Sequence, residues 1–218
     1  MMELCGREIN AIIFDLDGTL IDSTSVWENV DKAFFESRGM KIPENYVDEI
    51  AHIGLKEAAM FTKKKYHIQD SVESILQEWR NSSMKQYLED VQLKPHVYDF
   101  LVKLKKNNVK LAIATANDRQ LYEPCLKRLV IYDFFDFIAD VDTVNAGKNS
   151  VKLYHYVAKN LNEKPENIAI FEDISTGLKT AFENGYTCIA VYDEHSKKED
   201  DLKKKYSHRF IYDFNELL

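Results

Sequence analysis

Short, continuous apolar runs alternate along the chain with stretches in which apolar residues recur every three or four positions. Such runs are typical of strands that are covered on both faces of a sheet. The strands predicted in this way span residues 9–14, 109–115, 135–139, 167–171 and 187–191, with a short sixth at 210–212. The periodic stretches between them predict amphipathic helices. The alternation therefore predicts an α/β fold with a doubly wound, mainly parallel sheet and right-handed crossovers.

The stretch from about Ser23 to Asp90 has helical periodicity only, and we find no strand pattern in it. Its first predicted helix carries Val26, Val30 and Phe34 on one face, at spacings of four residues. Because this stretch follows the first strand, it would emerge at the carboxyl edge of the sheet. We therefore predict an α/β core formed by residues 1–21 and 92–218, with a helical cap inserted as residues 22–91.

Polar side chains follow three of the predicted strands. Asp15 and Asp17 come after the first strand, Thr115 ends the second, and Glu172 and Asp173 come after the fourth. In an open α/β sheet the carboxyl ends of the strands form the ligand-binding edge. Four carboxylates cannot all stay ionised in one crevice without a counter-cation. Oxygen ligands without nearby histidine or cysteine favour a hard cation, and we expect Mg²⁺ before Ca²⁺ or Mn²⁺.

A lysine in the polar loop before the fourth strand, Lys148, is the candidate cation for a substrate phosphate. Lys148 and Mg²⁺ together would bind a dianionic phosphate, with Thr115 and backbone N–H groups on its remaining oxygens. One carboxylate could then attack as a nucleophile and form an aspartyl phosphate. A second carboxylate two residues further on could protonate the leaving oxygen and later deprotonate water.

These segments, in this order, resemble the four motifs of the haloacid dehalogenase superfamily. DLDGTL at residues 15–20 resembles the first motif, and LAIAT, which ends at Thr115, resembles the second. GKNS, which contains Lys148, and FEDISTG, which contains Glu172 and Asp173, resemble the third and fourth. The helical insertion is similar to the C1 cap of this superfamily. The subgroup with that cap contains beta-phosphoglucomutase and phosphoglycolate phosphatase-like phosphatases, and the resemblance implies a Rossmann-like core.

The resemblance implies a role for each matched residue. Asp15 would be the nucleophile and Asp17 the general acid/base. The implied phosphate-binding residues are Thr115, Ala116 and Lys148, and the implied Mg²⁺ ligands are Asp15, Asp17 through its backbone carbonyl, Glu172 and Asp173. The superfamily often has Pro-x-Pro after the lysine of the third motif, whereas Asn149-Ser150-Val151 follows Lys148 here, which makes Lys152 the fallback.

A lysine of the cap, Lys56, is the candidate for substrate recognition. It follows Gly54-Leu55, where beta-phosphoglucomutases carry an arginine shortly after a glycine–hydrophobic pair. The absence of that arginine makes a mutase less favoured by the sequence but does not exclude it. A solvated helix lysine is the alternative interpretation of Lys56.

Composition excludes several classes of partner. The formal net charge of −7, from 29 basic and 36 acidic residues, argues against nucleic acids and anionic membranes as partners. The three cysteines form no CxxC pair, which favours a reducing, cytoplasmic location without disulfides. No apolar run approaches the length of a membrane span. We expect a monomer or a weak homodimer.

The function that we predict is hydrolysis of a small phosphorylated metabolite by an Mg²⁺-dependent phosphatase, through an aspartyl phosphate. Two alternatives stay open. A phosphomutase of the beta-phosphoglucomutase type would use the same pair of aspartates, with a sugar in place of water. A non-catalytic phosphate-ligand-binding or regulatory protein could also be built on this fold.

Overall fold

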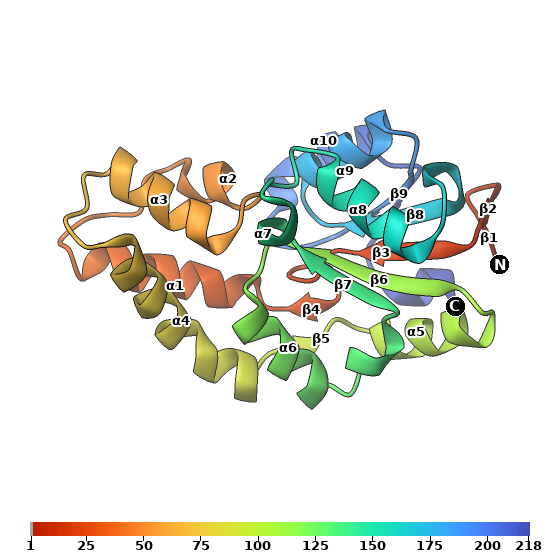
Figure 1. Ribbon diagram of the computed structural model, residues 1–218, viewed down its shortest axis with the longest axis horizontal. Helices are drawn as coiled ribbons and strands as arrows, with labels where there is room; N and C mark the ends of the chain where they lie inside the picture. Colours follow the sequence, from red (N-terminus) through yellow and green to blue (C-terminus); the bar gives the residue numbers. More distant parts are fainter. Residues whose placement is uncertain (1) are drawn as a thin grey trace.

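A six-stranded parallel sheet forms the centre of the computed structural model, which describes residues 2–218 (Figure 1). Each of the six predicted runs contributes one strand, so the predicted α/β class is confirmed. The order across the sheet is β10-β9-β8-β3-β6-β7. The strands are β3 (Ala11–Phe14), β6 (Lys110–Thr115), β7 (Phe137–Asp140), β8 (Ile168–Glu172), β9 (Thr187–Val191) and β10 (Arg209–Ile211).

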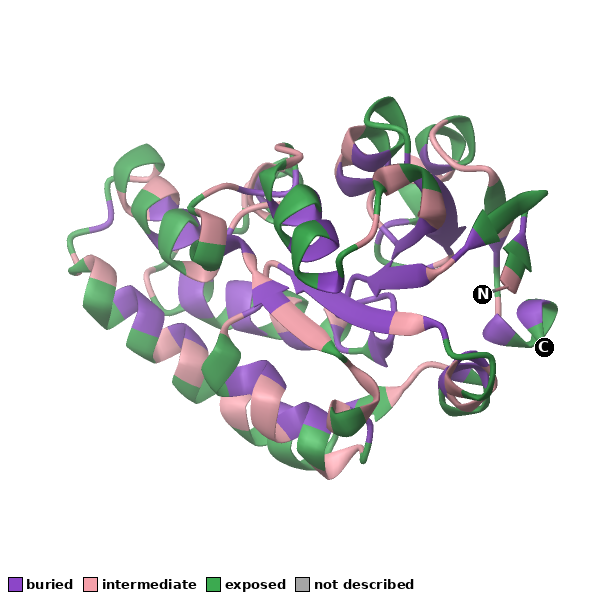
Figure 2. Ribbon diagram, turned by 45° about the vertical axis from the view of Figure 1, so that its right-hand side comes forward, coloured by how far each residue is buried: buried purple, intermediate pink, exposed green. Residues whose placement is uncertain are grey.

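Helices cover both faces of this sheet because its strands are apolar on both sides. Along β3, Ile12 and Phe14 belong to one core, whereas Ala11 and Ile13 belong to the other. The first core contains α5 (Val97–Lys106) and α6 (Arg119–Arg128), and the second contains α8 (Lys152–Leu161) and α9 (Ser175–Glu183). In Figure 2 most of the sheet is buried, and exposed residues lie mainly on the surrounding helices and loops.

The helical insertion is joined to the sheet by a two-stranded antiparallel link, β4 (Ile21–Asp22) with β5 (Gln92–Leu93). The predicted boundaries at residues 21 and 92 fall on this link. The insertion contains α1 (Thr24–Glu36), α2 (Tyr46–Ile50), α3 (Leu55–Lys65) and α4 (Val72–Glu89). It lies beyond the carboxyl end of β3, at the left of Figure 1.

Several short elements have no counterpart in the apolar pattern. They are the hairpin β1 (Met2–Leu4) and β2 (Arg7–Ile9), the helices α7 (Val141–Val144) and α10 (Asp200–Lys205), and the 3-10 turns η1 (Tyr132–Phe134), η2 (Pro165–Asn167), η3 (Lys197–Glu199) and η4 (Phe214–Leu217). Within residues 2–218, every helix is too short or too polar to cross a membrane.

Candidate active site

The loop that follows β3 brings two aspartates to the carboxyl edge of the sheet. The backbone N–H of Asp15 donates to the carbonyl of Phe171 at 2.8 Å, which continues the pairing of β3 with β8. Gly18 then turns the chain with φ +80°, and a Cβ at this position would lie 2.4 Å from Oδ2 of Asp173. Only glycine combines that dihedral angle with so close an approach. The loops after β3 and β8 are thereby held against each other.

A buried lysine links the two loops. Lys148 Nζ donates to Asp15 Oδ1 and, at 2.9 Å, to Glu172 Oε2. All three residues are buried. Burial lowers the pKa of Lys148, but the adjacent Asp15 and Glu172 carboxylates outweigh it and raise that pKa above its ordinary value. Lys148 is therefore held in its charged form between these two carboxylates.

Three buried carboxylates can place one oxygen each within 4.8 Å of the others: those of Asp15, Glu172 and Asp173. Burial and the charge of Asp15 raise the pKa of Glu172 to about 7. Burial, followed by Asp15 and Glu172, also raises the pKa of Asp173 well above its ordinary value. One lysine does not neutralise this cluster. A hard divalent cation fits the all-oxygen donor set and would relieve the repulsion.

The carboxylate of Asp17 is held apart from that cluster by neutral donors. Ser23 Oγ donates to it at 2.6 Å and Asn117 Nδ2 at 2.9 Å, and the hydroxyl of Tyr87 donates to Oδ1. Trp27 Nε1 in turn donates to the Tyr87 hydroxyl at 2.8 Å. Burial raises the pKa of Asp17, although the hydrogen bonds from Ser23 and Tyr87 oppose it. Coordination of a metal through the Asp17 backbone carbonyl stays a prediction.

The other predicted residues differ in their relation to the cavity beside this cluster. Ala116 lines it, whereas Thr115 is fully buried and its Oγ1 accepts the backbone N–H of Asn117 at 3.0 Å. Lys56 is not among the residues that line the cavity. Its charge is instead felt by Asp142 of α7. Burial and the charge of Asp140 raise the pKa of Asp142, and the Lys56 ammonium opposes this rise. A role for Lys56 in substrate recognition has no support from this placement.

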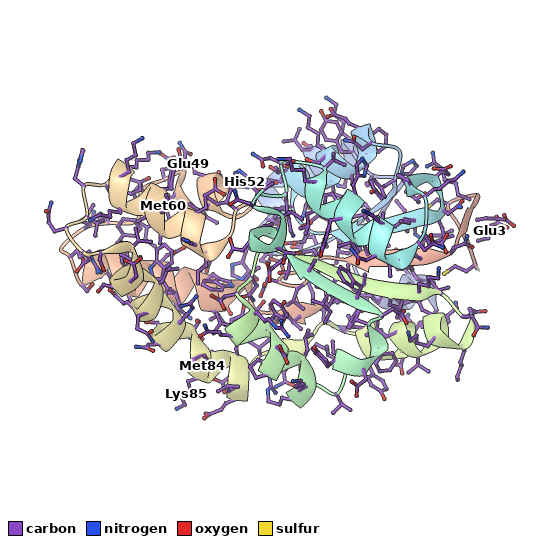
Figure 3. The ribbon with its side chains drawn as sticks, in the orientation of Figure 1. Glu3, Glu49, His52, Met60, Met84 and Lys85 are labelled. Atoms are coloured by element: carbon purple, nitrogen blue, oxygen red, sulfur yellow. The ribbon has the colours of Figure 1, made fainter. Side chains whose placement is uncertain are left out.

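The cap closes over the site through direct contacts. The backbone N–H of Lys148 donates to the carbonyl of His52 at 2.7 Å, and Figure 3 labels His52 where the cap meets the α/β unit. A Cβ on Gly54 would lie 2.6 Å from Oδ1 of Asp142, so the two units touch there as well. Farther along the boundary, Arg80 Nε of α4 donates to Asp118 Oδ2 at 2.8 Å.

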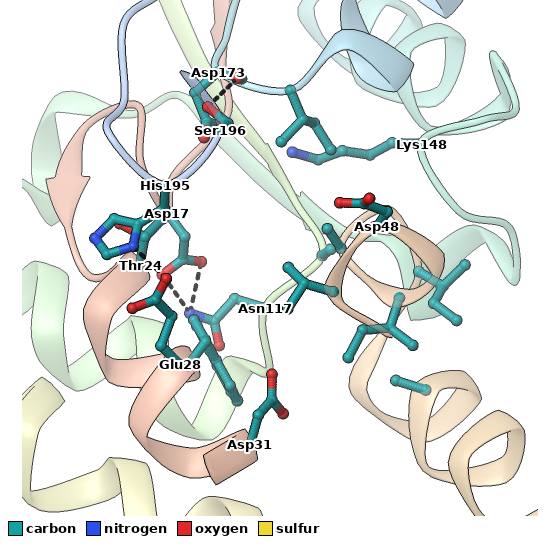
Figure 4. Close-up of a pocket in the computed structure, with 18 of the residues that line it drawn as sticks. Asp17, Thr24, Glu28, Asp31, Asp48, Asn117, Lys148, Asp173, His195 and Ser196 are labelled. Carbon is teal, nitrogen blue, oxygen red and sulfur yellow. Dashed lines mark hydrogen bonds and ion pairs between the residues drawn. The ribbon is translucent and has the colours of Figure 1, made fainter. Parts of the chain in front are cut away.

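A cavity of about 300 Å³ lies between the cap and the sheet edge (Figure 4). Asp15, Asp17, Asn117, Lys148 and Asp173 face it from the sheet. The cap contributes an apolar wall that includes Val47, Ile50, Ile53, Leu55 and Ala58. The site is thus a small cavity between cap and sheet, with Asp15, Lys148 and Asp173 on its sheet side.

Three site residues were missed in the sequence. Asn117 lies two positions after Thr115, at a strand end, and that position is a usable signal. Ser23 lies six residues after Asp17, at the start of α1. Tyr87 lies 70 residues from Asp17, and nothing in its sequence context marks it.

Comparisons with known proteins agree with this geometry. A family model described as haloacid dehalogenase-like hydrolase matches residues 12–191. The phosphorylated carbohydrates phosphatase of Thermotoga maritima is 28% identical over 173 residues, which cover 79% of this chain and 80% of that protein. The structure of CbbY from Rhodobacter sphaeroides in complex with phosphate is 25% identical, with a TM-score of 0.81 and 96% of each chain covered. Beta-phosphoglucomutase from Clostridium difficile, at 24% identity, has a TM-score of 0.79 over 96% of this chain and 93% of that one, and shares the fold.

Proposed function

The chain belongs to the haloacid dehalogenase-like hydrolase family, and from this premise we propose that it is an Mg²⁺-dependent phosphatase of a small phosphorylated metabolite. The observation that carries the proposal is the contrast between two aspartates two residues apart. Asp15 is ion-paired with Lys148, whereas Asp17 is held by neutral donors with a raised pKa. One is suited to attack a phosphate, and the other to carry a proton. The names of the Thermotoga relative and of the phosphate complex support this reaction class.

The reaction divides into two displacements at phosphorus. A carboxylate oxygen of Asp15 bonds to phosphorus while the ester P–O bond breaks, and Asp17 gives its proton to the leaving oxygen. Asp17 then takes a proton from water, and the water oxygen bonds to phosphorus as the bond to Asp15 breaks. Inorganic phosphate and the alcohol are the products, and both aspartates return to their starting states.

Lys148, together with a cation held by three carboxylates, would counter the negative charge of the phosphoryl group. Asp15, Glu172 and Asp173 are the residues that would hold Mg²⁺, which when bound supplies charge neutralisation for the phosphoryl oxygens. Lys148 holds Asp15 in place from the opposite side and offers its remaining donor capacity to the phosphate. The hydrogen bond from the Lys148 backbone to His52 brings the cap against this end of the cavity.

Phosphate release from p-nitrophenyl phosphate tests this function. We expect release with Mg²⁺, none with EDTA, and none above background for Asp15→Asn, which keeps the shape but loses the nucleophile. Asp22→Asn is the matched control, because Asp22 is an exposed aspartate just beyond the same loop. An Asp15→Asn variant with wild-type turnover would refute the nucleophile. Mg²⁺ binding without hydrolysis of any ester in a broad panel would favour the non-catalytic alternative.

The cavity between cap and sheet also suits the phosphomutase alternative, in which a sugar hydroxyl replaces water as the phosphoryl acceptor. Asp15 and Asp17 would act in the same way in both reactions. Incubation with beta-glucose 1-phosphate distinguishes them, because a mutase forms the 6-phosphate without net phosphate release. A phosphatase releases inorganic phosphate in proportion to the substrate consumed.

A further inference from the structure

A buried carboxylate in the cavity wall has no partner. Asp31 of α1 lines the cavity with 6% of its surface exposed. Within residues 2–218, we find neither a hydrogen-bond donor nor a cation paired with its side chain. Figure 4 shows the Asp31 carboxylate at the edge of the cavity, away from the Lys148 end. An isolated buried carboxylate is unfavourable, and a ligand that supplies a positive donor would stabilise its ionised form.

The direction of this side chain follows from helix geometry. Thr24, Trp27, Glu28 and Asp31 are spaced i, i+3, i+4 and i+7 along α1, and all four line the cavity. Residues at these spacings share one face of a helix. Val30, by contrast, is buried in the core of the molecule. Asp31 therefore belongs to the face that α1 presents to the substrate.

The basic side chains of the cavity are already committed. Lys148 is paired with Asp15 and Glu172 at the reacting end. His195 Nδ1 lies 2.6 Å from Glu28 Oε1. Lys198 Nζ lies 2.6 Å from Asp48 Oδ1. Among the described residues that line the cavity, each basic side chain already has a carboxylate partner.

Building on the proposed phosphatase function, we propose that the substrate is the phosphate monoester of an amino alcohol, amino sugars included, whose ammonium group pairs with Asp31. The phosphate would lie at Asp15 and Lys148, and the amine would lie at the cap. The indole rings of Trp27 and Trp79, which also line the cavity, add an aromatic surface that favours a cation. A bisphosphate would place its second phosphate among paired or acidic side chains.

Matched substrate pairs test the proposal. The pairs are glucosamine 6-phosphate with glucose 6-phosphate, 2-aminoethyl phosphate with 2-hydroxyethyl phosphate, and 3-aminopropyl phosphate with propyl phosphate. We expect the amine to be preferred by about tenfold or more in kcat/KM in at least one pair, as a charge-assisted contact in a desolvated site provides. Asp31→Asn should abolish that preference. No preference in any pair, or a preference that survives Asp31→Asn, would overturn the proposal.

A control variant separates this contact from the general negative field of the cavity. Glu44 also lines the cavity but is exposed, so Glu44→Gln removes one charge without changing the Asp31 position. The amine preference should persist in Glu44→Gln. A loss equal to that of Asp31→Asn would mean that overall charge, and not Asp31, selects the amine.

Binding to the Asp15→Asn variant keeps the proposal separate from catalysis. Calorimetry on this variant should give a Kd for the amine that is about tenfold or more below that for its neutral partner, and Asp15→Asn/Asp31→Asn should bind both equally. If no ester is hydrolysed but this difference is found, the phosphatase function fails and the amine subsite stands. If hydrolysis occurs and binding shows no difference, only the amine subsite fails.

Discussion

At the residue scale, the two aspartates after β3 acquire different chemistry from their partners. Asp15 is ion-paired with Lys148, which places a positive charge directly against the proposed nucleophile. Asp17 is bonded by Ser23, Asn117 and the Tyr87 hydroxyl, which fix its position without adding charge. Such neutral donors let the carboxyl gain and lose a proton while staying in place.

Tyr87 positions Asp17 from the cap, and its removal should affect proton transfer selectively. For Tyr87→Phe we expect kcat for an alkyl phosphate to fall by roughly tenfold, because the leaving alkoxide needs the proton from Asp17. The value for p-nitrophenyl phosphate should change little, since p-nitrophenolate leaves without one. Steady-state kinetics at saturating Mg²⁺ give the ratio of kcat for the alkyl phosphate to kcat for p-nitrophenyl phosphate.

Tyr122→Phe is the matched control for that experiment. Tyr122 is likewise buried and donates to a carboxylate, Asp140, at 3.4 Å, but this pair does not contact Asp17. Its removal should leave the ratio of the two substrates unchanged. An equal fall for both substrates in Tyr87→Phe would contradict positioning and indicate a general loss of structure.

Asp31 should make the free protein less stable as the pH rises. Burial, and then the charge of Glu28, raise the Asp31 pKa to about 7, whereas an unfolded aspartate titrates near 3.8. The folded state therefore keeps a proton that the unfolded state loses, and stability falls between about pH 4 and pH 7. This loss of stability is at most about 4 kcal/mol, and Asp31→Asn should abolish it. Urea unfolding at pH 5 and pH 8 measures the free energy of unfolding of both proteins. An equal change between the two pH values in wild type and Asp31→Asn would refute the prediction.

Asp15 and Asp173 were predictable at the sheet edge because each directly follows a strand, and Lys148 because of its polar loop and its place in the order of the motifs. Asp15, Lys148 and Asp173 could be assigned to one site once the strand order along the chain was clear. Tyr87 and Asp31 could not, because each lies on an ordinary amphipathic helix. Only the packing of the cap against the sheet decides which face of α1 or α4 meets the cavity.

At the element scale, the buried strands were predictable and the small elements were not. A run such as residues 187–191 is buried at every position, and its limits in the structure agree with those predicted. The β1–β2 hairpin has three residues in each strand, and charged side chains make up half of these six residues. Its pattern is too short to separate from a loop, and pairing with its own neighbour is what makes it a strand.

Helix α4 is the element that joins the cap to the core. Its Arg80 contacts Asp118, whose other oxygen accepts the N–H of Gln120 at the start of α6. Arg80→Gln should remove a partly buried ion pair and destabilise this contact by about 1 kcal/mol. Amides of α4 should then exchange about fivefold faster. Hydrogen–deuterium exchange followed by peptide measures this change.

Lys85→Gln supplies the comparison within the same helix. Lys85 pairs with Glu89 at 3.8 Å, and its side chain is 78% exposed, as its outward position in Figure 3 also shows. Removal of such an exposed pair should leave exchange in α4 unchanged. Equal acceleration in both variants would mean that the Arg80–Asp118 contact does not hold the cap.

At the scale of the whole molecule, the cap and the sheet enclose a site whose charge is incompletely balanced. The net charge of −7 is spread over the chain, but at the site three carboxylates meet one lysine. Binding of a divalent cation there should stabilise the native state, because the unfolded chain does not assemble the three ligands. The same repulsion should make the metal-free protein the less stable form.

Mg²⁺ should therefore raise the Tm, and the rise should depend on Asp173. At a hundredfold excess over its Kd, the ion should contribute about 2.7 kcal/mol, or roughly 5 to 10 °C in Tm. Asp173→Asn should lose most of this rise while the metal-free variant unfolds no earlier than wild type, because burial and neighbouring carboxylates disfavour the Asp173 charge. Asp22→Asn, outside the cluster, should keep the full rise. Scanning calorimetry with Mg²⁺ and with EDTA measures the rise in Tm for each protein. A full rise in Asp173→Asn would mean that the ion binds elsewhere.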